Sequence, residues 1–170
     1  AKVAKAVENE RDAIEFQEVM DDLLAWADRW KMEFNVGKCR VMHIGRNNGR
    51  RKYKMNGSEL AEVEEEKDLG VWVESSLKPG LQCQAAAADA NRTLGLILRT
   101  FHFRDKETLV SLYKSLVRPK LEFAAAAWNP WLAKDVECLE KVQRRLVRSL
   151  SNVNCMSYEE KLKDAGLTTL

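Results

Sequence analysis

Two clusters of basic side chains have the residue types and spacing that favour binding to a phosphate-rich partner. One cluster falls in a loop that also contains glycine and asparagine, and its members are Arg46, Arg50, Arg51, Lys52 and Lys54. The other has the i, i+3, i+4, i+7 spacing of one helix face, at Lys141, Arg144, Arg145 and Arg148. Such side chains can neutralise phosphates and give a salt-dependent, sequence-independent affinity. A solvated hairpin tip and a solvated helix face are equally good interpretations.

Residues that could carry out catalysis are few. Asp21 and Asp22 are adjacent carboxylates that could help to bind Mg²⁺. They lie within an amphipathic helical pattern, so we interpret them as part of a solvated helix face. The sequence has only two histidines, His43 and His102, which makes a Ser, His and Asp triad implausible. Both histidines are interpreted as structural or exposed.

The cysteines give no sign of a metal site or of a disulfide framework. They are widely spaced, with no CxxC pair and no histidine at zinc-finger spacing, at Cys39, Cys83, Cys138 and Cys155. This usage predicts reduced thiols. No apolar run approaches the roughly 18 residues of a membrane span, and the first residues lack an apolar signal-peptide region. We therefore expect an intracellular protein, in the nucleus or cytoplasm, that is not secreted and has no membrane partner.

Composition and charge indicate a folded chain with two different halves. The chain has 170 residues, of which 45% are apolar and 32% charged, so it can form one compact domain or two small ones. The net charge of +2 conceals an asymmetry. Residues 1–76 hold 13 basic and 16 acidic side chains, whereas residues 77–150 hold 13 and 7. The more basic second part favours a polyanionic partner.

The first half has the patterns of one helix and of short strands. Residues 8–30 predict an amphipathic helix, whose apolar stripe consists of Ile14, Val19, Leu23, Trp26, Ala27 and Trp30. Three short antiparallel strands are expected in CRVMHIG, YKMNG and DLGVWV, separated by a basic loop and an acidic stretch. Asn56-Gly57 predicts a tight hairpin turn between strands.

Helices are expected after Pro79-Gly80. We expect a helix start at Asp105, a break at Pro119, and a final helix that begins at a Ser157 and Glu160 capping box and stops at Gly166. Another helix carries the apolar stripe Val136, Leu139, Val142, Leu146 and Leu150. The alanine tracts 85–88 and 124–127 predict close helix packing. The predicted fold class is α+β: a helix with a small antiparallel sheet over 1–78, then an all-helical bundle of about four or five helices over 79–170.

Seven segments carry a resemblance to a known family, in this order: WADRWKMEFNVGKCRVMHIGRNN, YKMNG, EEEKDLGVWVESSLKP, QCQAAAADANRTLG, YKSLVRPKLEFAAAAWNPW, LEKVQRRL and SYEEKLKDAGLTTL. Together they closely resemble the C-terminal part of the reverse transcriptase domain of non-LTR (LINE) retrotransposons, of the chicken-repeat type. The resemblance implies the end of a polymerase palm followed by a thumb. It places the family's Asp-Asp hairpin, which binds Mg²⁺ in the intact polymerase, before Ala1. We therefore expect no cofactor in this chain and no catalysis by it alone.

The resemblance also implies roles for individual residues. Lys38, in NVGKC, matches the motif D lysine that protonates the pyrophosphate leaving group, although a lysine at a surface turn is the simpler interpretation. Leu69, Gly70 and Val71 match the primer grip, where Gly70 would permit a close backbone approach or a bulge. The thumb-like part would contact the backbone of a duplex of RNA template and DNA primer.

The alanines in LEFAAAAWNPW depart from the family, which usually carries larger or polar residues there. A second hypothesis follows from this departure. The chain would then be a domesticated or remnant module that binds nucleic acid or a protein without catalysis, with a protein partner bound through the region of Trp128 and Trp131. A reading frame with no selected function is a third possibility.

Overall fold

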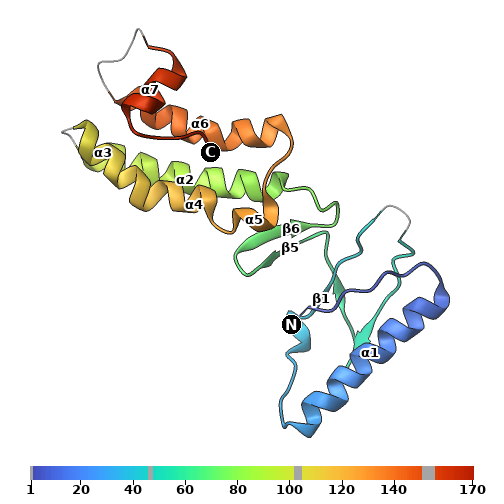
Figure 1. The fold of residues 1–170 in the computed structure, drawn as a ribbon. Coiled ribbons are helices and arrows are strands. Elements are labelled where there is room, and N and C mark those ends of the chain that lie inside the picture. The colour runs from blue at the N-terminus through green and yellow to red at the C-terminus, as the bar shows by residue number, and fades with distance from the viewer. Residues whose placement is uncertain (1, 46–47, 102–104, 151–155) are drawn as a thin grey trace. The chain divides into compact units, whose positions relative to one another are not determined.

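The computed structural model of the chain describes residues 2–45, 48–101, 105–150 and 156–170. The fold is α+β, with helices and two-stranded sheets, as predicted. The chain divides into two compact units (Figure 1). The first unit contains residues 1–66 and 74–77, and the second contains 67–73 and 78–170. The expected boundary after residue 78 differs from this division in two places, because residues 67–73 and residue 78 group with the helices.

The predicted N-terminal helix is present as α1 (Glu10–Arg29). It begins with a capping box, in which the Asn9 side chain accepts a hydrogen bond from the Asp12 amide and the Asp12 carboxylate accepts one from the Asn9 amide, at 3.0 and 3.2 Å. After the helix, Lys31 adopts a left-handed φ of 55°. The amphipathic pattern therefore placed both the helix and its ends well.

The predicted apolar stripe of α1 is confirmed at Ala27 but wrong about most of the other residues that the helix buries. Ala13, Met20 and Ala27 are its buried residues. Ile14, Trp26 and Trp30 of the predicted stripe are 56%, 48% and 63% exposed. The first unit presents only strands of two residues to the helix, so it covers a narrow part of α1 and leaves these larger side chains at the surface.

The strands of the first unit form two separate sheets. β2 (Lys54–Met55) pairs antiparallel with β3 (Ser58–Glu59) around Asn56-Gly57, whose φ angles of 50° and 74° confirm the predicted tight turn. β1 (Arg40–Val41) pairs with β4 (Ala61–Glu62) in parallel, so the prediction of an all-antiparallel sheet is wrong. The acidic stretch, which was expected to be a connection, supplies β4 and so gives β1 a different partner.

Contacts from α1 to β2 hold the first unit together. The Gln17 amide nitrogen donates to the Lys54 carbonyl at 2.8 Å, and the Lys54 amide donates to the Gln17 side-chain oxygen at 3.0 Å. The rings of Phe16 and Tyr53 meet edge to face with centroids 5.0 Å apart. These contacts fix the position of β2 against α1.

A two-residue turn connects β5 (Glu65–Asp68) to β6 (Val71–Glu74), and these strands form a third sheet. The first helix of the second unit is α2 (Gly80–Thr100), which contacts both α4 (Arg118–Glu122) and α6 (Ala133–Ser149) (Figure 1). Ala86, Ala87 and Ala90 of α2 are buried, which confirms close packing for the first alanine tract. Small side chains let neighbouring helices approach closely, and this positions α6 beside α2.

Close packing is wrong for the second alanine tract. Ala124 has a left-handed φ of 52°, and within α5 (Ala125–Trp128) only Trp128 is buried. The indole nitrogen of Trp128 donates to the Phe123 carbonyl at 2.8 Å. The alanines thus form a tight surface turn whose one large residue reaches into the core.

Pro119 does not break the helix that precedes it, contrary to the prediction. α3 (Lys106–Leu112) begins at the predicted cap Asp105 and continues through a π-helix, η2 (Tyr113–Val117), into α4. Pro119 lies in the first turn of α4. A wider π turn accommodates the missing N–H and the bulk of the ring without ending the helical path.

The last two helices follow the predicted pattern. Four members of the predicted stripe of α6 are buried, at Leu139, Val142, Leu146 and Leu150. α7 (Tyr158–Asp164) has the predicted capping box, and Gly166 follows it with a left-handed φ of 60°. Buried Gln143 accepts a hydrogen bond from Tyr113 at 2.8 Å and donates one to the Thr168 carbonyl at 2.9 Å. None of the helices in the described ranges is long and apolar enough to cross a membrane.

Candidate nucleic-acid interface

Three of the four described cations of the basic loop are held by carboxylates of the first unit, and the exposed fourth, Lys54, makes no ion pair among the described residues. Arg50 pairs with Glu62 and Glu64, at nitrogen to oxygen distances of 3.2 and 2.7 Å. Arg51 pairs with Glu10 at 3.0 Å, and Lys52 pairs with Glu59 at 2.7 Å, while Arg46 lies outside the described residues. A phosphate would therefore have to compete with carboxylates already bound to these cations.

The pKa shifts agree with this pairing. The hydrogen bond to Glu59 raises the pKa of Lys52 above its ordinary value. A hydrogen bond from Ser75, followed by the hydrogen bond from Arg50, lowers the pKa of Glu64. Both shifts favour the charged forms that make the ion pairs.

The basic stripe of α6 divides between two directions. Arg144 pairs with Glu137 at 2.6 Å, and its guanidinium lies 5.0 Å from the centroid of the Tyr158 ring. Arg145 instead donates to the Asn91 side-chain oxygen of α2 at 3.1 Å. Neighbouring residues of an α-helix point about 100° apart, so a single stripe in the sequence becomes two environments.

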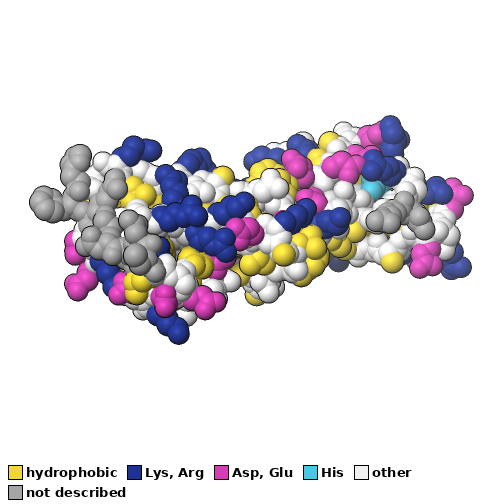
Figure 2. Space-filling view, turned by 90° about the horizontal axis from the view of Figure 1, so that it is seen from above, with side chains coloured by type: hydrophobic (Ala, Val, Ile, Leu, Met, Phe, Trp, Pro, Cys, Tyr) yellow, Lys and Arg dark blue, Asp and Glu magenta, His cyan; other side chains and the backbone are white. Residues whose placement is uncertain are grey.

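The face shared by α2 and α6 carries cations with few carboxylate partners. Lys141, Arg145 and Arg148 are exposed on α6, and Arg99 is exposed on α2. Within the part of the chain that the structure describes, none of these four makes an ion pair. Figure 2 shows Lys and Arg side chains lying close to one another on the helical unit. We name these four residues the α2–α6 face.

Sequence reasoning did not single out Arg99. Asn91, Gly95 and Arg99 follow one another at four-residue steps along α2, on the side that meets Arg145. This i, i+4, i+8 spacing was available in the sequence. The importance of this spacing could not be predicted from the sequence, because only the packing of α6 on α2 shows that Arg145 lies beside these three residues.

The hairpin tip between β5 and β6 presents an apolar side chain on a firm support. Leu69 and Gly70 have φ angles of 47° and 91°, and Leu69 is 90% exposed. A Cβ on Gly70 would lie 3.1 Å from the Phe123 ring, so the close approach expected at this glycine is present, in a turn and not in a bulge. Val71 packs against the helical core. The hairpin tip is therefore fixed by the second unit.

Lys38 is at the surface, at the end of the short 3₁₀ helix η1 (Val36–Lys38). Its amide donates to the Asn35 carbonyl at 2.9 Å, and the Arg40 guanidinium donates to the Gly37 carbonyl at 2.7 Å. These bonds fix the backbone of the turn and leave the Lys38 side chain exposed. Lys38 belongs to the first unit and the hairpin tip to the second.

The residues considered for catalysis do not assemble into an active site. Asp21 and Asp22 are exposed on α1, where Asp21 accepts a hydrogen bond from Gln17 at 3.0 Å. His43 is buried near the Tyr53 ring, and His102 lies outside the described residues. The described ranges contain no group of three or more His, Cys, Asp and Glu side chains placed to hold a metal ion. The residues present therefore do not fit the Mg²⁺ site of a polymerase.

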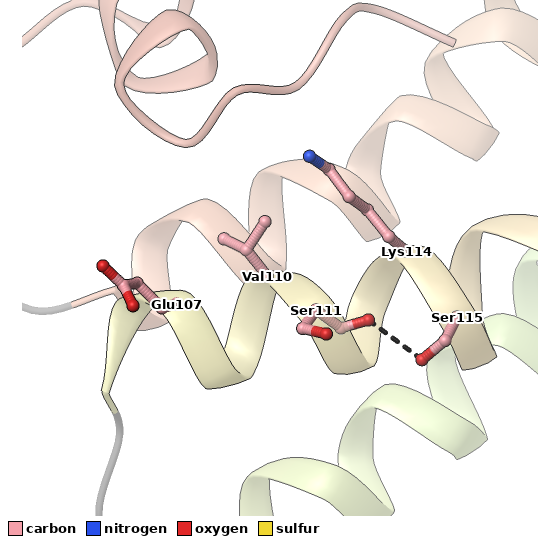
Figure 3. Close-up of a pocket in the computed structure, with 5 residues that line it drawn as sticks. All are labelled: Glu107, Val110, Ser111, Lys114 and Ser115. Atoms are coloured by element: carbon pink, nitrogen blue, oxygen red, sulfur yellow. Dashed lines mark hydrogen bonds between the residues drawn. The ribbon is translucent and has the colours of Figure 1, made fainter.

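A hollow on the helical unit also lacks a catalytic arrangement. It follows the outer side of α3 and η2 and is lined by Glu107, Val110, Ser111, Lys114 and Ser115 (Figure 3). Ser115 donates its hydroxyl to the Ser111 carbonyl at 2.9 Å, so this hydroxyl is bonded to backbone and not to a base (Figure 3). Lys114 is near Gly166, with its nitrogen 3.8 Å from where a Cβ would be.

No family model, no curated protein and no solved structure matches this chain. In the segment considered for protein binding, Trp128 is buried, whereas Trp131 is 67% exposed. Only Trp131 of the two tryptophans offers a surface to a partner.

Proposed function

We propose that this chain is the C-terminal part of the reverse transcriptase domain of a LINE-type retrotransposon, and that its helical unit contacts the backbone of a template–primer duplex. The observation that carries the proposal is the α2–α6 face, where cations without carboxylate partners gather on the more basic part of the chain. The ordered resemblance of seven segments supports it, as does the hairpin that groups with the helices.

The mechanism of binding is electrostatic. Each cation that meets a phosphate releases counterions, so the logarithm of the binding constant falls linearly with the logarithm of salt concentration. Such contacts position the duplex and carry no sequence information. We therefore propose two functional parts in the helical unit. The α2–α6 face would contact the duplex as a thumb does. The hairpin tip, Leu69 to Val71, would hold the end of the primer as a primer grip does.

No chemical step is assigned to this chain alone. Lys38 remains a proposed proton donor to the leaving group in an intact polymerase, because its side chain is exposed at a fixed turn. Mg²⁺ in that polymerase would be bound by residues outside this sequence. We expect the purified 170-residue chain to incorporate no nucleotide with Mg²⁺ or Mn²⁺, and template-dependent extension by it would contradict the proposal.

The binding proposal is tested with a short fluorescein-labelled RNA–DNA duplex, by anisotropy over a series of salt concentrations. We expect K141Q/R145Q/R148Q to weaken binding by about a hundredfold at low salt and to reduce the salt slope by about 2.7, since each phosphate contact contributes about 0.9. The matched control R50Q/R51Q/K52Q removes the same charge from the paired loop, and we expect a change of less than about threefold. Equal losses in the two variants, or binding that salt does not alter, would overturn the proposal.

A second candidate function, a module that binds a protein, is favoured by three exposed apolar side chains of the helical unit: Leu69, Phe123 and Trp131. The results expected for protein binding are the opposite of those expected for duplex binding. A protein partner bound through these residues would associate with little dependence on salt, and W131A would weaken it while K141Q/R145Q/R148Q would not.

A further inference from the structure

Two arginines from different helices converge on one glycine of the helical unit. A Cβ built on Gly95 would lie 3.5 Å from Nη1 of Arg99 and 3.5 Å from Nη2 of Arg145. The two nitrogens are therefore at most about 7 Å apart across that point. Gly95 itself is buried within α2, so the guanidinium groups cover the backbone where it has no side chain.

This arrangement places like charges together without a carboxylate between them. Among the described residues neither Arg99 nor Arg145 makes an ion pair, whereas Arg92, Arg118 and Arg144 each pair with a nearby acid. Arg145 is also oriented, because its Nη1 donates to the Asn91 side chain at 3.1 Å while Nη2 points to Gly95. Two guanidinium groups held in this way repel each other, and an anion between them would remove the repulsion.

We propose that Gly95, Arg99 and Arg145 form a binding site for a single phosphate group. The inference rests on the proposed function in taking that phosphate from a nucleic-acid backbone. Arginine presents planar N–H donors that match phosphate oxygens, and the absent side chain of Gly95 leaves room for the anion close to α2. The site adds Arg99 and Gly95 to the cations of α6.

The surroundings favour a polynucleotide over an acidic protein. Lys141 and Arg148 flank Arg145 on the exposed side of α6, and seven residues of helix span about 10 Å. Successive phosphates of one strand follow each other at about 3.4 Å along the duplex axis, so a row of this length meets several of them. An isolated carboxylate would bind between Arg99 and Arg145 but would leave Lys141 and Arg148 without anionic partners.

The first test measures duplex binding by R99Q, R145Q and the double variant, in the full chain. We expect each single change to weaken binding by about fivefold, and the double variant to lose less than the product, because both arginines hold one phosphate. The matched control is R92Q, on the same helix but paired with Asp89, which we expect to change binding by less than about twofold.

The second test uses G95A, whose effects on binding and on stability are expected to have opposite signs. The added methyl group makes ordinary van der Waals contacts at 3.5 Å, and alanine favours a helix more than glycine does. The melting temperature should therefore rise while duplex affinity falls. Unchanged duplex affinity in a G95A variant that melts no lower than the parent chain would contradict the site.

The outcomes separate this inference from the proposed function. If the chain binds the duplex and R99Q and R145Q behave like R92Q, the phosphate site is wrong and the proposed function stands. If the chain binds no duplex, but inorganic phosphate still shifts the NMR signals of both guanidinium groups, the proposed function is wrong and the phosphate site stands. If phosphate shifts neither signal, or a polyglutamate peptide competes as well as RNA of equal charge, the phosphate assignment is overturned.

Discussion

The basic loop and the α2–α6 face contain similar numbers of cations in opposite environments. In the loop, Arg50, Arg51 and Lys52 each contact a carboxylate at 2.7 to 3.2 Å. On the α2–α6 face, Arg145 contacts an amide, and Arg99 lies beside it. Cations contribute to the potential around a protein only to the extent that neighbouring anions leave them uncompensated. The comparison shows that the same sequence signal can mark a self-contained ion-pair network or an open anion site.

The two regions also depend on different forces for their shape. The loop is shaped by exposed ion pairs, which contribute little to stability singly. The α2–α6 face is shaped by the packing of α6 on α2, where Leu94, Val142 and Leu146 are fully buried. A change to the core should therefore disrupt the α2–α6 face and leave the loop intact.

The largest expected effect is that of L146A. Removing most of a fully buried side chain should lower the free energy of unfolding of the helical unit by about 3 kcal/mol. The measurement is chemical denaturation followed by circular dichroism, with duplex affinity measured alongside. The control is L96A on exposed Leu96 of α2, with an expected change within about 0.5 kcal/mol. A similar loss in both variants would contradict the view that packing positions this face.

The next effect is a gain of affinity in the loop. E62Q/E64Q removes both carboxylates that hold Arg50, so the loop acquires an uncompensated cation. Duplex affinity at low salt should rise by about threefold to tenfold, with a steeper salt slope. E65Q/E66Q is the control, since it removes the same charge from exposed residues of β5 that make no ion pair among the described residues, and we expect a smaller change from it. Unchanged affinity in E62Q/E64Q would show that pairing is not what separates the two regions.

The sequence predicted the helices better than the contacts between elements. The capping boxes at Asn9 and Ser157 and the turn at Asn56-Gly57 depend on a few adjacent residues, so local chemistry decides them. The pairing of β1 with β4 depends on residues about twenty positions apart in strands of two residues. A pattern of period two is too short there to fix a partner.

In the candidate site, too, the sequence did not predict the contacts between distant residues. The spacing of Lys141, Arg144, Arg145 and Arg148 predicted one face, but each side chain takes its direction from what packs beside it. Arg144 meets Glu137 and Tyr158, whereas Arg145 meets Asn91. The two carboxylates that pair with Arg50 come from the acidic stretch, which the sequence predicts to be a connection, and those that pair with Arg51 and Lys52 come from α1 and β3. Charge pairing between distant segments cannot be read from spacing along one segment.

The smallest expected effect is a difference in how the basic loop and the α2–α6 face respond to pH. The pKa of Glu64 lies below its ordinary value of 4.5, chiefly through Ser75 and then Arg50, so its contribution is present above that value and is lost as pH falls through the lowered pKa. The pKa of Lys52 lies above 10.5 through Glu59, so its contribution is present below that value and is lost as pH rises through the raised pKa.

The Arg50–Glu64 pair should therefore persist to below pH 4.5 and then open, and the Lys52–Glu59 pair should persist to above pH 10.5 before the ammonium loses its charge. Guanidinium groups keep their charge throughout. NMR signals of the Arg50 guanidinium and the Lys52 ammonium should move in these two pH ranges, and those of Arg99 and Arg145 should stay constant. E62Q/E64Q is the control, since it removes both carboxylates that pair with Arg50 and should abolish the acid transition there while preserving the alkaline one at Lys52. Movement of Arg145 with the acid transition would mean that a carboxylate compensates it after all, and the contrast between the regions would fail.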